Sequence, residues 1–436
     1  MCITFNFYST IYLSNIVKVI KKFEININLL YTNIQVLEAY MRIGIFTDSY
    51  YPLIAGVATS IEMLQTALED MGHSVYIVAQ NLENQKFIYD KEHKIIRLPG
   101  IKTNIPNIRI TSVYSSRAMK IIKDEWHLDI IHAQTEGTVG AFSHIVSKKL
   151  KLPVVHTYHT LYEDYVYYVT HGYFDKLSKR VLAKYTKYYY DNKCDELIVP
   201  TDKIKDIFNN KYNIKREIHV IPSGIDTKKF YSTSTTKKIA QSIRKKYKLR
   251  DDDFVIGSVG RVALEKSFDK IIETLVNLVK INNKIKFMLV GDGAELNNLK
   301  KLAKKLKVDK NVVFTGMVDP VEVANYYHAF DVMVSFSTTE TQGMTIIEGL
   351  ASSLPVVCID DDSFRSVIQN NYNGYLFKNN DEYQKYILTL MSNKELYKTM
   401  SMNAKNSTYS YSKEVFASRV LKVYHQALEN KKLNQK

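Results

Sequence analysis

The chain has 436 residues, of which 45% are hydrophobic and 24% charged, a composition typical of a folded globular protein rather than a disordered one. At roughly 150 residues per domain, this length allows two large or three small domains and excludes a short module. The three cysteines, Cys2, Cys194 and Cys358, lie far apart, which argues against a disulfide framework or a thiolate zinc site and favours a reducing compartment. The net charge of +15 predicts a surface that attracts nucleic acid, phosphorylated small molecules or acidic lipid.

Residues 1–40 are expected to form a segment of their own, because Met41 begins a run that is typical of the first strand of a domain. The uncharged stretch from Ile3 to Val17 contains several Asn, Ser and Thr residues, so it is too short and too polar to span a bilayer. It also lacks the basic region and the small-residue cleavage site of a signal peptide. We predict a start assigned too far upstream or a loosely ordered extension, with a membrane-touching amphipathic tail as the alternative.

From Met41 onward, strand-like apolar runs alternate with helical patterns. In the first part of the chain, strands are expected at 42–47, 73–79, 129–132, 153–156, 196–200 and 218–222, with a helix over 59–71. A second series has strands at 254–259, 286–290, 312–315, 331–336 and 355–359, with helices near 269–280, up to 307, after 320 and after 343. Such alternation predicts an α/β protein whose parallel sheets carry helices on both faces.

The pattern breaks around 224–230 and continues into the polar stretch 232–236, where we place the domain junction. We therefore predict an N-terminal Rossmann-like domain over 41–225, a C-terminal one over 226–411, and a final helical segment over 412–436. Open parallel sheets bind ligands beyond the carboxyl ends of their strands. The default binding site is thus the cleft between two doubly wound sheets that face one another.

Two glutamates, Glu340 and Glu348, bracket the start of a predicted helix. Gly343 lets the backbone turn closely there, and the free N–H groups at Met344 and Thr345 make the helix N-terminus an anion site suited to a diphosphate. The alternative is that Glu340 merely caps the helix and that Glu348 is a solvated surface residue, since carboxylates at this spacing are common.

Arg261 and Lys266 follow the strand 254–259, in the strand-to-helix loop on the same side of the sheet. A guanidinium and an ammonium that converge on a helix N-terminus form a phosphate clamp. The alternative is two solvated cations in a basic protein.

Five motifs of the second half, taken in order and spacing, resemble the nucleotide-sugar half of the retaining glycosyltransferases of family four. They are 260–266, 290–293, 314–316, 331–337 and 340–348. The resemblance extends from Met41 to the C-terminus. It implies the GT-B architecture of two Rossmann-like domains, a nucleoside-diphosphate-sugar donor held mainly by the C-terminal domain, and transfer without a metal ion.

The same resemblance implies roles for individual residues. Arg261 and Lys266 hold the diphosphate, Glu348 accepts hydrogen bonds from the ribose hydroxyls, and Glu340 contacts the donor sugar. Gly56 lies where the family brings backbone close to the diphosphate. Ser267 departs from the family, because many members have glycine there. The resemblance also implies that the segment after 412, with helical spacing of Val415, Val420 and Val423, crosses back onto the first domain.

In the first half, Ile54-Ala-Gly-Val57 stands where glycogen and starch synthases have Lys-x-Gly-Gly, which argues against a polysaccharide synthase. His159 comes just past a predicted strand end, and in relatives a histidine here lies near the donor sugar and the acceptor. The alternatives are a metal pair with His156, which needs further ligands, and a structural histidine; His132 is a weaker candidate.

The run from His156 to Tyr165 resembles one branch of the family, the bacterial diacylglycerol glucosyltransferases, and places Tyr162 on the acceptor side. The helical stretch 175–193 has apolar and aromatic residues on one stripe, namely Leu177, Val181, Tyr185 and Tyr188. Its other stripe is basic and consists of Lys176, Lys179, Arg180, Lys184 and Lys187. Such a helix suits an anionic lipid surface, where each basic residue contributes about 1 kcal/mol. The alternative is a surface helix that packs its apolar stripe on the sheet.

We therefore predict a retaining enzyme that moves a hexose, glucose from UDP-glucose, to diacylglycerol, without a cofactor and without a metal. It is expected in the cytoplasm, attached peripherally to the inner face of the cell membrane, with no nucleic acid as partner. One alternative is a family-four enzyme with another acceptor: an inositol phospholipid, malate or a growing glycan. A basic nucleic-acid-binding protein lacks a recognisable module here, and a nicotinamide enzyme needs more than Gly291-Asp-Gly293.

Overall fold

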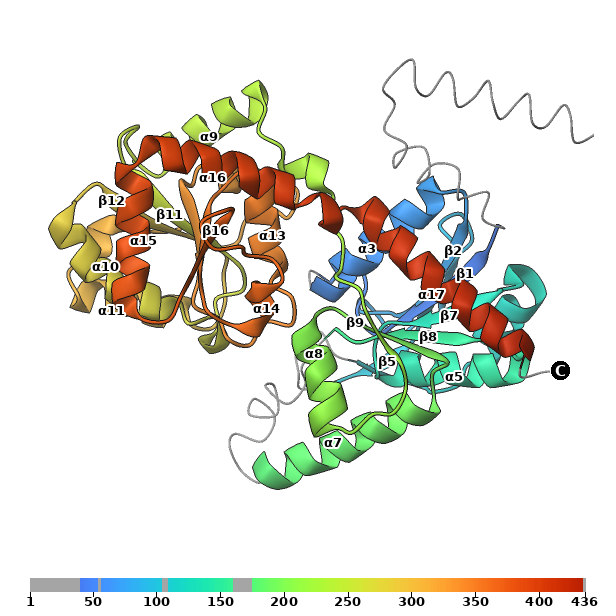
Figure 1. Cartoon of the computed structure of the whole chain (residues 1–436). Helices are drawn as coiled ribbons and strands as arrows, with labels where there is room; N and C mark the ends of the chain where they lie inside the picture. Colours follow the sequence, from blue (N-terminus) through green and yellow to red (C-terminus); the bar gives the residue numbers. More distant parts are fainter. Residues whose placement is uncertain (1–39, 54–55, 104–108, 160–174, 434–436) are drawn as a thin grey trace, which may run out of the picture. The chain divides into compact units, whose positions relative to one another are not determined.

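The computed structural model describes residues 40–53, 56–103, 109–159 and 175–433, with the backbone alone for 175–182. The predicted segment 1–40 therefore lies outside the described residues, apart from Tyr40. Residues Arg42–Lys436 form one unit that contains two parallel β-sheets flanked by helices (Figure 1). Among the helices of the described ranges, none combines the length and the apolar character that crossing a membrane requires.

The first sheet, called here the N-terminal sheet, has eight strands in the order β10-β9-β8-β7-β1-β2-β4-β3. Its strands are β1 (Arg42–Thr47), β2 (Ser74–Gln80), β3 (Ile88–Asp90), β4 (Ile95–Leu98), β7 (Ile130–Ala133), β8 (Val154–Thr157), β9 (Glu196–Val199) and β10 (Ile218–Val220). All neighbours are parallel except β3 and β4. Because β1 pairs with β2 on one side and with β7 on the other, the winding direction reverses between β1 and β7.

Apolar residues at helical spacing hold the helices against this sheet. In α3 the buried residues include Ile61, Leu64 and Leu68, and in α5 they include Val139 and Phe142. The helices and the small separate sheet of this half are α3 (Gly56–Asp70), β5 (Gly100–Lys102), β6 (Arg109–Thr111), α4 (Ser116–Ile121), α5 (Thr138–Leu150), α7 (Asp175–Asn192) and α8 (Asp202–Asp206). The helix predicted over 59–71 is present but begins three residues earlier.

The second sheet, called here the C-terminal sheet, has six parallel strands in the order β13-β12-β11-β14-β15-β16. Its strands are β11 (Phe254–Val259), β12 (Ile285–Val290), β13 (Val312–Phe314), β14 (Val332–Ser335), β15 (Val356–Ile359) and β16 (Gly374–Phe377). Neighbouring residues such as Val255 and Ile256 enter different hydrophobic cores, one on each face of the sheet. The predicted α/β class with two doubly wound sheets is thus confirmed.

Most helices of the second half lie against these two cores. They are α9 (Ser234–Lys246), α10 (Phe268–Ile281), α11 (Leu296–Lys305), α12 (Val323–Tyr327), α13 (Met344–Ala351), α14 (Asp362–Arg365), α15 (Asn380–Ser392) and α16 (Lys394–Ser407). The polar stretch 232–236, expected as an irregular junction, instead starts α9. Thr233 caps this helix and exchanges hydrogen bonds with Thr236 in a capping box, so these polar residues serve a helix N-terminus.

The last helix, α17 (Lys413–Leu433), returns to the first half of the chain and packs against α3 and β8 (Figure 1). Lys413 Nζ lies 2.8 Å from Asp70 Oδ2, at the end of α3. Further along, the Tyr424 hydroxyl is 2.6 Å from His132 Nδ1 in the interior of the N-terminal sheet. The helix therefore completes the core of a sheet whose strands all lie far upstream.

Candidate functional site

In the C-terminal sheet the strand order reverses between β11 and β14, which are direct neighbours through the pairs Ile256–Val332 and Gly257–Met333. In open parallel sheets the crevice at this reversal, beyond the carboxyl ends of the strands, is the position where ligands bind. The loop 260–267 leaves β11 at this edge, and the loop 336–343 leaves β14. Both sequence motifs singled out for a diphosphate therefore lie at the reversal point.

Lys266 and Glu340 meet at this edge. Lys266 ends a short 3-10 turn after β11, and its Nζ donates a hydrogen bond of 2.6 Å to Glu340 Oε1. Both side chains are mostly buried. The Ser337 hydroxyl donates to the Glu265 carbonyl at 3.2 Å and thereby joins the two loops. Lys266 thus lies beside the start of α13, as the sequence predicts.

Arg261 pairs within its own loop. Its Nη2 lies 2.6 Å from Glu265 Oε1, four residues ahead on the same loop, and its side chain is 58% exposed. The pair forms locally, because Glu265 offers a carboxylate four residues away. The expected contact of Arg261 with a diphosphate stays a prediction.

The N-terminus of α13 has the geometry of an anion site. Gly343 has φ +74°, and a Cβ atom there would lie 2.6 Å from Phe364 Cε1, so this position requires glycine. No side chain caps the helix at Gly343, so Glu340 is not the cap that the alternative assigns to it. The amides of Met344 and Thr345 belong to the first turn, where N–H groups lack intrahelical acceptors and favour a negative charge.

Glu348 lies further along α13 and is not a solvated surface residue. The Tyr327 hydroxyl, fully buried on α12, donates a hydrogen bond of 2.5 Å to Glu348 Oε2. Burial raises the pKa of Glu348 to about 7, although the hydrogen bond from Tyr327 and the charge of Lys229 act in the opposite direction. Glu348 is therefore a carboxyl group that gains or loses its proton near neutral pH.

Ser267, the position where the sequence departs from its family, lies between Lys266 and α10. It has φ +53° and ψ +37°, in the left-handed region that favours glycine. The loop thus keeps the backbone conformation that a glycine would adopt without strain.

Gln342 is a site residue that the sequence analysis missed. Its side-chain oxygen accepts from the Ser223 amide and its nitrogen donates to the Ser223 carbonyl, both at 2.8 Å. The Ser60 hydroxyl donates to Ser223 Oγ at 2.8 Å, which connects this segment to α3, the helix that begins at Gly56. No local pattern signals this contact, because the partners lie 119 and 163 residues apart.

In the N-terminal sheet, His159 follows β8 and is partly exposed. Its Nε2 lies 2.6 Å from Gln134 Oε1, after β7. Burial lowers the pKa of His159 to about 4, with a smaller opposing effect from Glu136, so the ring is neutral at pH 7. His132 is fully buried between Tyr424 and Thr157, so it is a structural residue.

Two carboxylates at the reversal point of the N-terminal sheet also escaped prediction. Asp48, after β1, accepts from the Thr135 hydroxyl at 2.7 Å and from the Val139 amide at 3.0 Å, so it fixes the start of α5. Glu136, after β7, accepts from the Tyr190 hydroxyl. An acidic residue in a loop has no sequence pattern that indicates which distant hydroxyl or amide group it contacts.

The helix α7 confirms the predicted helical stretch after 175. Lys184 is exposed, whereas Lys187 is partly buried and lies 3.3 Å from Asp191. Tyr185 and Tyr188 are 47% and 56% exposed, so these members of the predicted apolar stripe do not pack on the sheet. The buried contacts come instead from Thr186, Tyr189 and Tyr190. The side chains of Lys176, Lys179 and Arg180, and all of Tyr162, lie outside the described residues.

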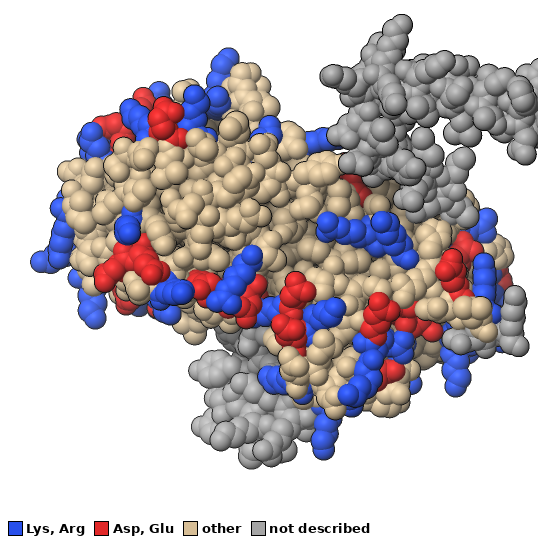
Figure 2. Space-filling model, viewed as in Figure 1, with Lys and Arg blue, Asp and Glu red and all other residues tan. Residues whose placement is uncertain are grey.

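The excess positive charge is not gathered into one patch on the face in view, where Lys and Arg alternate with Asp and Glu (Figure 2). In the described part of the chain, no three His, Cys, Asp or Glu side chains come together as metal ligands.

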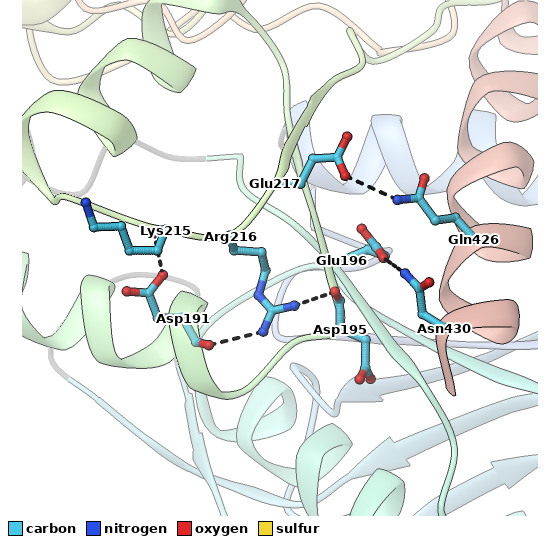
Figure 3. Close-up of a pocket in the computed structure, with 8 residues that line it drawn as sticks. All are labelled: Asp191, Asp195, Glu196, Lys215, Arg216, Glu217, Gln426 and Asn430. Atoms are coloured by element: carbon cyan, nitrogen blue, oxygen red, sulfur yellow. Dashed lines mark hydrogen bonds between the residues drawn. The ribbon is translucent and has the colours of Figure 1, made fainter. Parts of the chain in front are cut away.

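An open pocket of about 530 Å³ lies at the amino ends of β9 and β10, away from both reversal points (Figure 3). It is lined by Asp191, Asp195, Glu196, Lys215, Arg216, Glu217, Gln426 and Asn430. These groups mainly bind one another: Asn430 donates to Glu196 at 2.9 Å, and Arg216 donates to backbone carbonyls. The pocket therefore joins α17 and α7 to the sheet.

Comparison with known proteins gives two family matches that together cover most of the chain. Residues 54–229 match the model of Glycosyltransferase Family 4, and residues 240–407 match that of Glycosyl transferases group 1. The alpha-monoglucosyldiacylglycerol synthase of Acholeplasma laidlawii is 36% identical over 406 residues, which are 91% of this chain and 100% of the relative. The enzyme of the same name from Streptococcus pneumoniae is 35% identical, over 89% of this chain and 86% of its own.

Among solved structures, Anabaena HepE in complex with UDP and glucose is similar, with a TM-score of 0.68 and 17% identity over 89% of this chain and 100% of its own. This likeness shows a shared fold, and the expected GT-B assignment is confirmed.

Proposed function

Because this chain belongs to glycosyltransferase family 4, we propose that it transfers glucose from UDP-glucose to 1,2-diacylglycerol, with retention of configuration, to give monoglucosyldiacylglycerol. The relative from Acholeplasma laidlawii, matched over its whole length, carries the name of that product and supports the choice of acceptor. The observation that carries the proposal in the structure is the meeting of Lys266 with Glu340 at the start of α13, on the loop edge where a nucleotide diphosphate binds.

On the donor side, the diphosphate binds the first-turn amides of α13 and the ammonium group of Lys266. Arg261, which is largely exposed, turns from Glu265 toward the phosphates when the donor arrives. Glu348 accepts from the ribose hydroxyls, and Glu340 binds the sugar once the diphosphate takes its place beside Lys266. The exposed Gly56 at the start of α3 leaves room for a phosphate beside its backbone.

The reaction breaks the bond between the anomeric carbon and the diphosphate oxygen, and negative charge develops on the leaving phosphate. Lys266, Arg261 and the dipole of α13 stabilise that charge without a metal ion. The acceptor hydroxyl attacks from the same face, and its proton passes to the departing phosphate. His159, neutral at pH 7 and fixed by Gln134, lies beside the sugar and the acceptor.

On the acceptor side, the protein binds peripherally to the inner face of the cell membrane through α7. The exposed Tyr185 and Tyr188 suit the boundary between lipid headgroups and acyl chains, while Lys184 suits anionic headgroups. The charge reversal Lys184→Glu is expected to weaken binding to anionic vesicles. The same reversal at the exposed Lys237 of α9 is the matched control and is expected to have little effect.

The test is transfer of radiolabelled sugar from UDP-glucose, UDP-galactose and GDP-mannose to diacylglycerol vesicles, with and without anionic lipid and with and without a chelator. We expect labelled glycolipid from UDP-glucose only, stimulated by anionic lipid and insensitive to the chelator. Donor binding without any labelled lipid would overturn the acceptor, label from another donor would overturn the sugar, and loss of activity with the chelator would overturn transfer without a metal.

A further inference from the structure

Glu136 lies beyond the carboxyl ends of the strands of the N-terminal sheet, where its side chain is mostly buried. It follows β7 at the reversal point, and its side chain is only 11% exposed. Asp48 holds the same loop from the other side of the reversal through the Thr135 hydroxyl and the Val139 amide. The loop that carries Glu136 is thus well fixed, on the edge where ligands bind in such sheets.

The helix α7 contacts Glu136 at two points. The Tyr190 hydroxyl donates to its carboxylate, and the Tyr185 hydroxyl donates to its backbone carbonyl at 3.4 Å. His156, fully buried on β8, brings its Nε2 to 3.2 Å from the Tyr190 hydroxyl and 3.4 Å from Glu136 Oε1. The carboxylate of Glu136, the phenol of Tyr190 and the imidazole of His156 therefore form one cluster. His156 lies three residues before His159 in the sequence.

The opposite face of the same helix is the one that suits a lipid surface. Tyr185 lies at the boundary of the two faces, because about half of the residue is exposed while its hydroxyl contacts the Glu136 carbonyl. Arg216 donates to the carbonyl oxygens of Tyr190 and Asp191 at the last turn of α7, each at 3.1 Å. Figure 3 shows the contact with Asp191. This end of α7 is therefore fixed to the sheet, next to the turn that contacts Glu136.

We propose that Glu136 is a positioning residue that transmits the docking of α7 on anionic lipid, through Tyr190 and His156, to the acceptor side of the active site. This inference rests on the proposed function, since it requires a lipid acceptor. It goes further by naming the contact through which the membrane surface raises turnover.

The experiment compares the wild-type protein with Tyr190→Phe and Glu136→Gln in transfer from UDP-glucose to diacylglycerol vesicles of increasing anionic-lipid content. Each substitution alters one hydrogen-bonding group and keeps the shape of the side chain. We expect kcat at high anionic lipid to fall about tenfold and the stimulation by anionic lipid to be lost. The KM for UDP-glucose and the fraction of protein that sediments with vesicles are expected to stay unchanged.

Tyr189→Phe is the matched control, because this neighbouring tyrosine of α7 is also directed inward. Its hydroxyl pairs with His144 Nε2 at 2.7 Å rather than with Glu136. We expect wild-type stimulation by anionic lipid in this variant. The double variant of Tyr190 and Glu136 is expected to be no worse than Tyr190→Phe alone, since Tyr190→Phe removes the donor of the contact that Glu136→Gln only weakens by removing the charge of its acceptor.

Three results would overturn the inference. The first is a Tyr190→Phe variant that responds to anionic lipid as Tyr189→Phe does. The second is a joint loss of UDP-glucose affinity and thermal stability in both test variants, which marks a purely structural role. The third result is a wild-type protein that labels no diacylglycerol. In that case the proposed function fails as well, whereas the first two results leave it standing.

Discussion

The ammonium group of Lys266 lies 2.6 Å from Glu340 Oε1, so a cation assigned to the donor diphosphate is neutralised by the carboxylate assigned to the donor sugar. Neither charge is left alone in this mostly buried position, which would be unfavourable. Under the proposed function, we expect donor binding to exchange these partners: the diphosphate takes the place of the carboxylate beside Lys266, and Glu340 turns to the sugar.

Removal of either partner should separate these two roles. For Lys266→Met we expect kcat to fall by about 10²- to 10³-fold, because a charge that stabilises the leaving group is lost. For Glu340→Gln we expect tighter UDP binding but lower kcat, since Lys266 is no longer shared while the sugar contact is weakened. Kinetics and UDP titration check both variants, with Lys270→Met on the exposed face of α10 as control. Equal affinity of UDP for Glu340→Gln and wild type would argue against the exchange.

The raised pKa of Glu348 predicts a pH dependence of donor binding. Its pKa of about 7 means that the native protein holds a proton there that the unfolded chain releases near 4.5. This site therefore lowers the free energy of unfolding as pH rises from about 4.5 to 7. The ionised carboxylate is the better acceptor for ribose hydroxyls, so UDP affinity should rise as pH passes through about 7.

Calorimetric titration with UDP between about pH 6 and 8 checks this expectation. Glu348→Gln should bind UDP more weakly and lose the pH dependence. Tyr327→Phe should move the transition to higher pH, because the hydrogen bond from Tyr327 lowers the pKa of Glu348. A transition that stays at the same pH in both variants would assign it to another group.

Gly56 offers a substitution that separates stability from donor binding. It is exposed at the start of α3, and a Cβ atom there meets nothing within 4 Å. Gly56→Ala should therefore raise the free energy of unfolding by up to about 1 kcal/mol through helix propensity. If the diphosphate approaches this backbone, the KM for UDP-glucose should rise about tenfold at unchanged fold. Thr66→Ala, further along α3, is the control and should leave KM unchanged; an equal KM in both variants contradicts the role of Gly56.

Ser267 predicts a gain in stability on substitution by glycine. The left-handed backbone conformation is unfavourable by about 1–2 kcal/mol for a residue other than glycine. Glycine avoids this strain, but part of the gain is offset because glycine is more flexible in the unfolded chain. Ser267→Gly should raise the free energy of unfolding by about 0.5–1 kcal/mol, and a thermal melt should show a higher Tm. Ser267→Ala keeps the strain and should not do so. A Tm lowered by glycine would mean that the serine side chain stabilises the loop.

Five of the six strands of the C-terminal sheet could be predicted from sequence, because strands buried on both faces form short apolar runs. The sixth, β16 (Gly374–Phe377), was not predicted. The strand 254–259 has the predicted bounds, and β14 and β15 differ from theirs by one or two residues. The short strands β3 to β6 lack such a run. The polar stretch 232–236 predicts a domain junction, whereas in the structure Thr233 caps α9, because the same polar residues suit loops and helix N-termini.

The residues expected at the donor site could be predicted from motifs, but their contacts with one another could not. Arg261 and Glu265 stand four residues apart, which is compatible with a pair between them but does not establish one. The contacts of Gln342 with Ser223 and of Glu136 with Tyr190 join polar residues from distant segments. Neither helical nor strand periodicity carries information on such pairs, so only the structure reveals them.

The contact between His132 and Tyr424 also bears on how the protein is made. These residues are 292 positions apart, and the histidine belongs to the interior of the first sheet. During synthesis, the strands of that sheet leave the ribosome long before α17 exists, and the whole six-stranded sheet is translated in between. The surface of the first half that packs against α17 stays uncovered until this last helix has been synthesised. A chain that ends shortly before Lys413 therefore contains every strand of both sheets but leaves the N-terminal sheet without the helix that covers it.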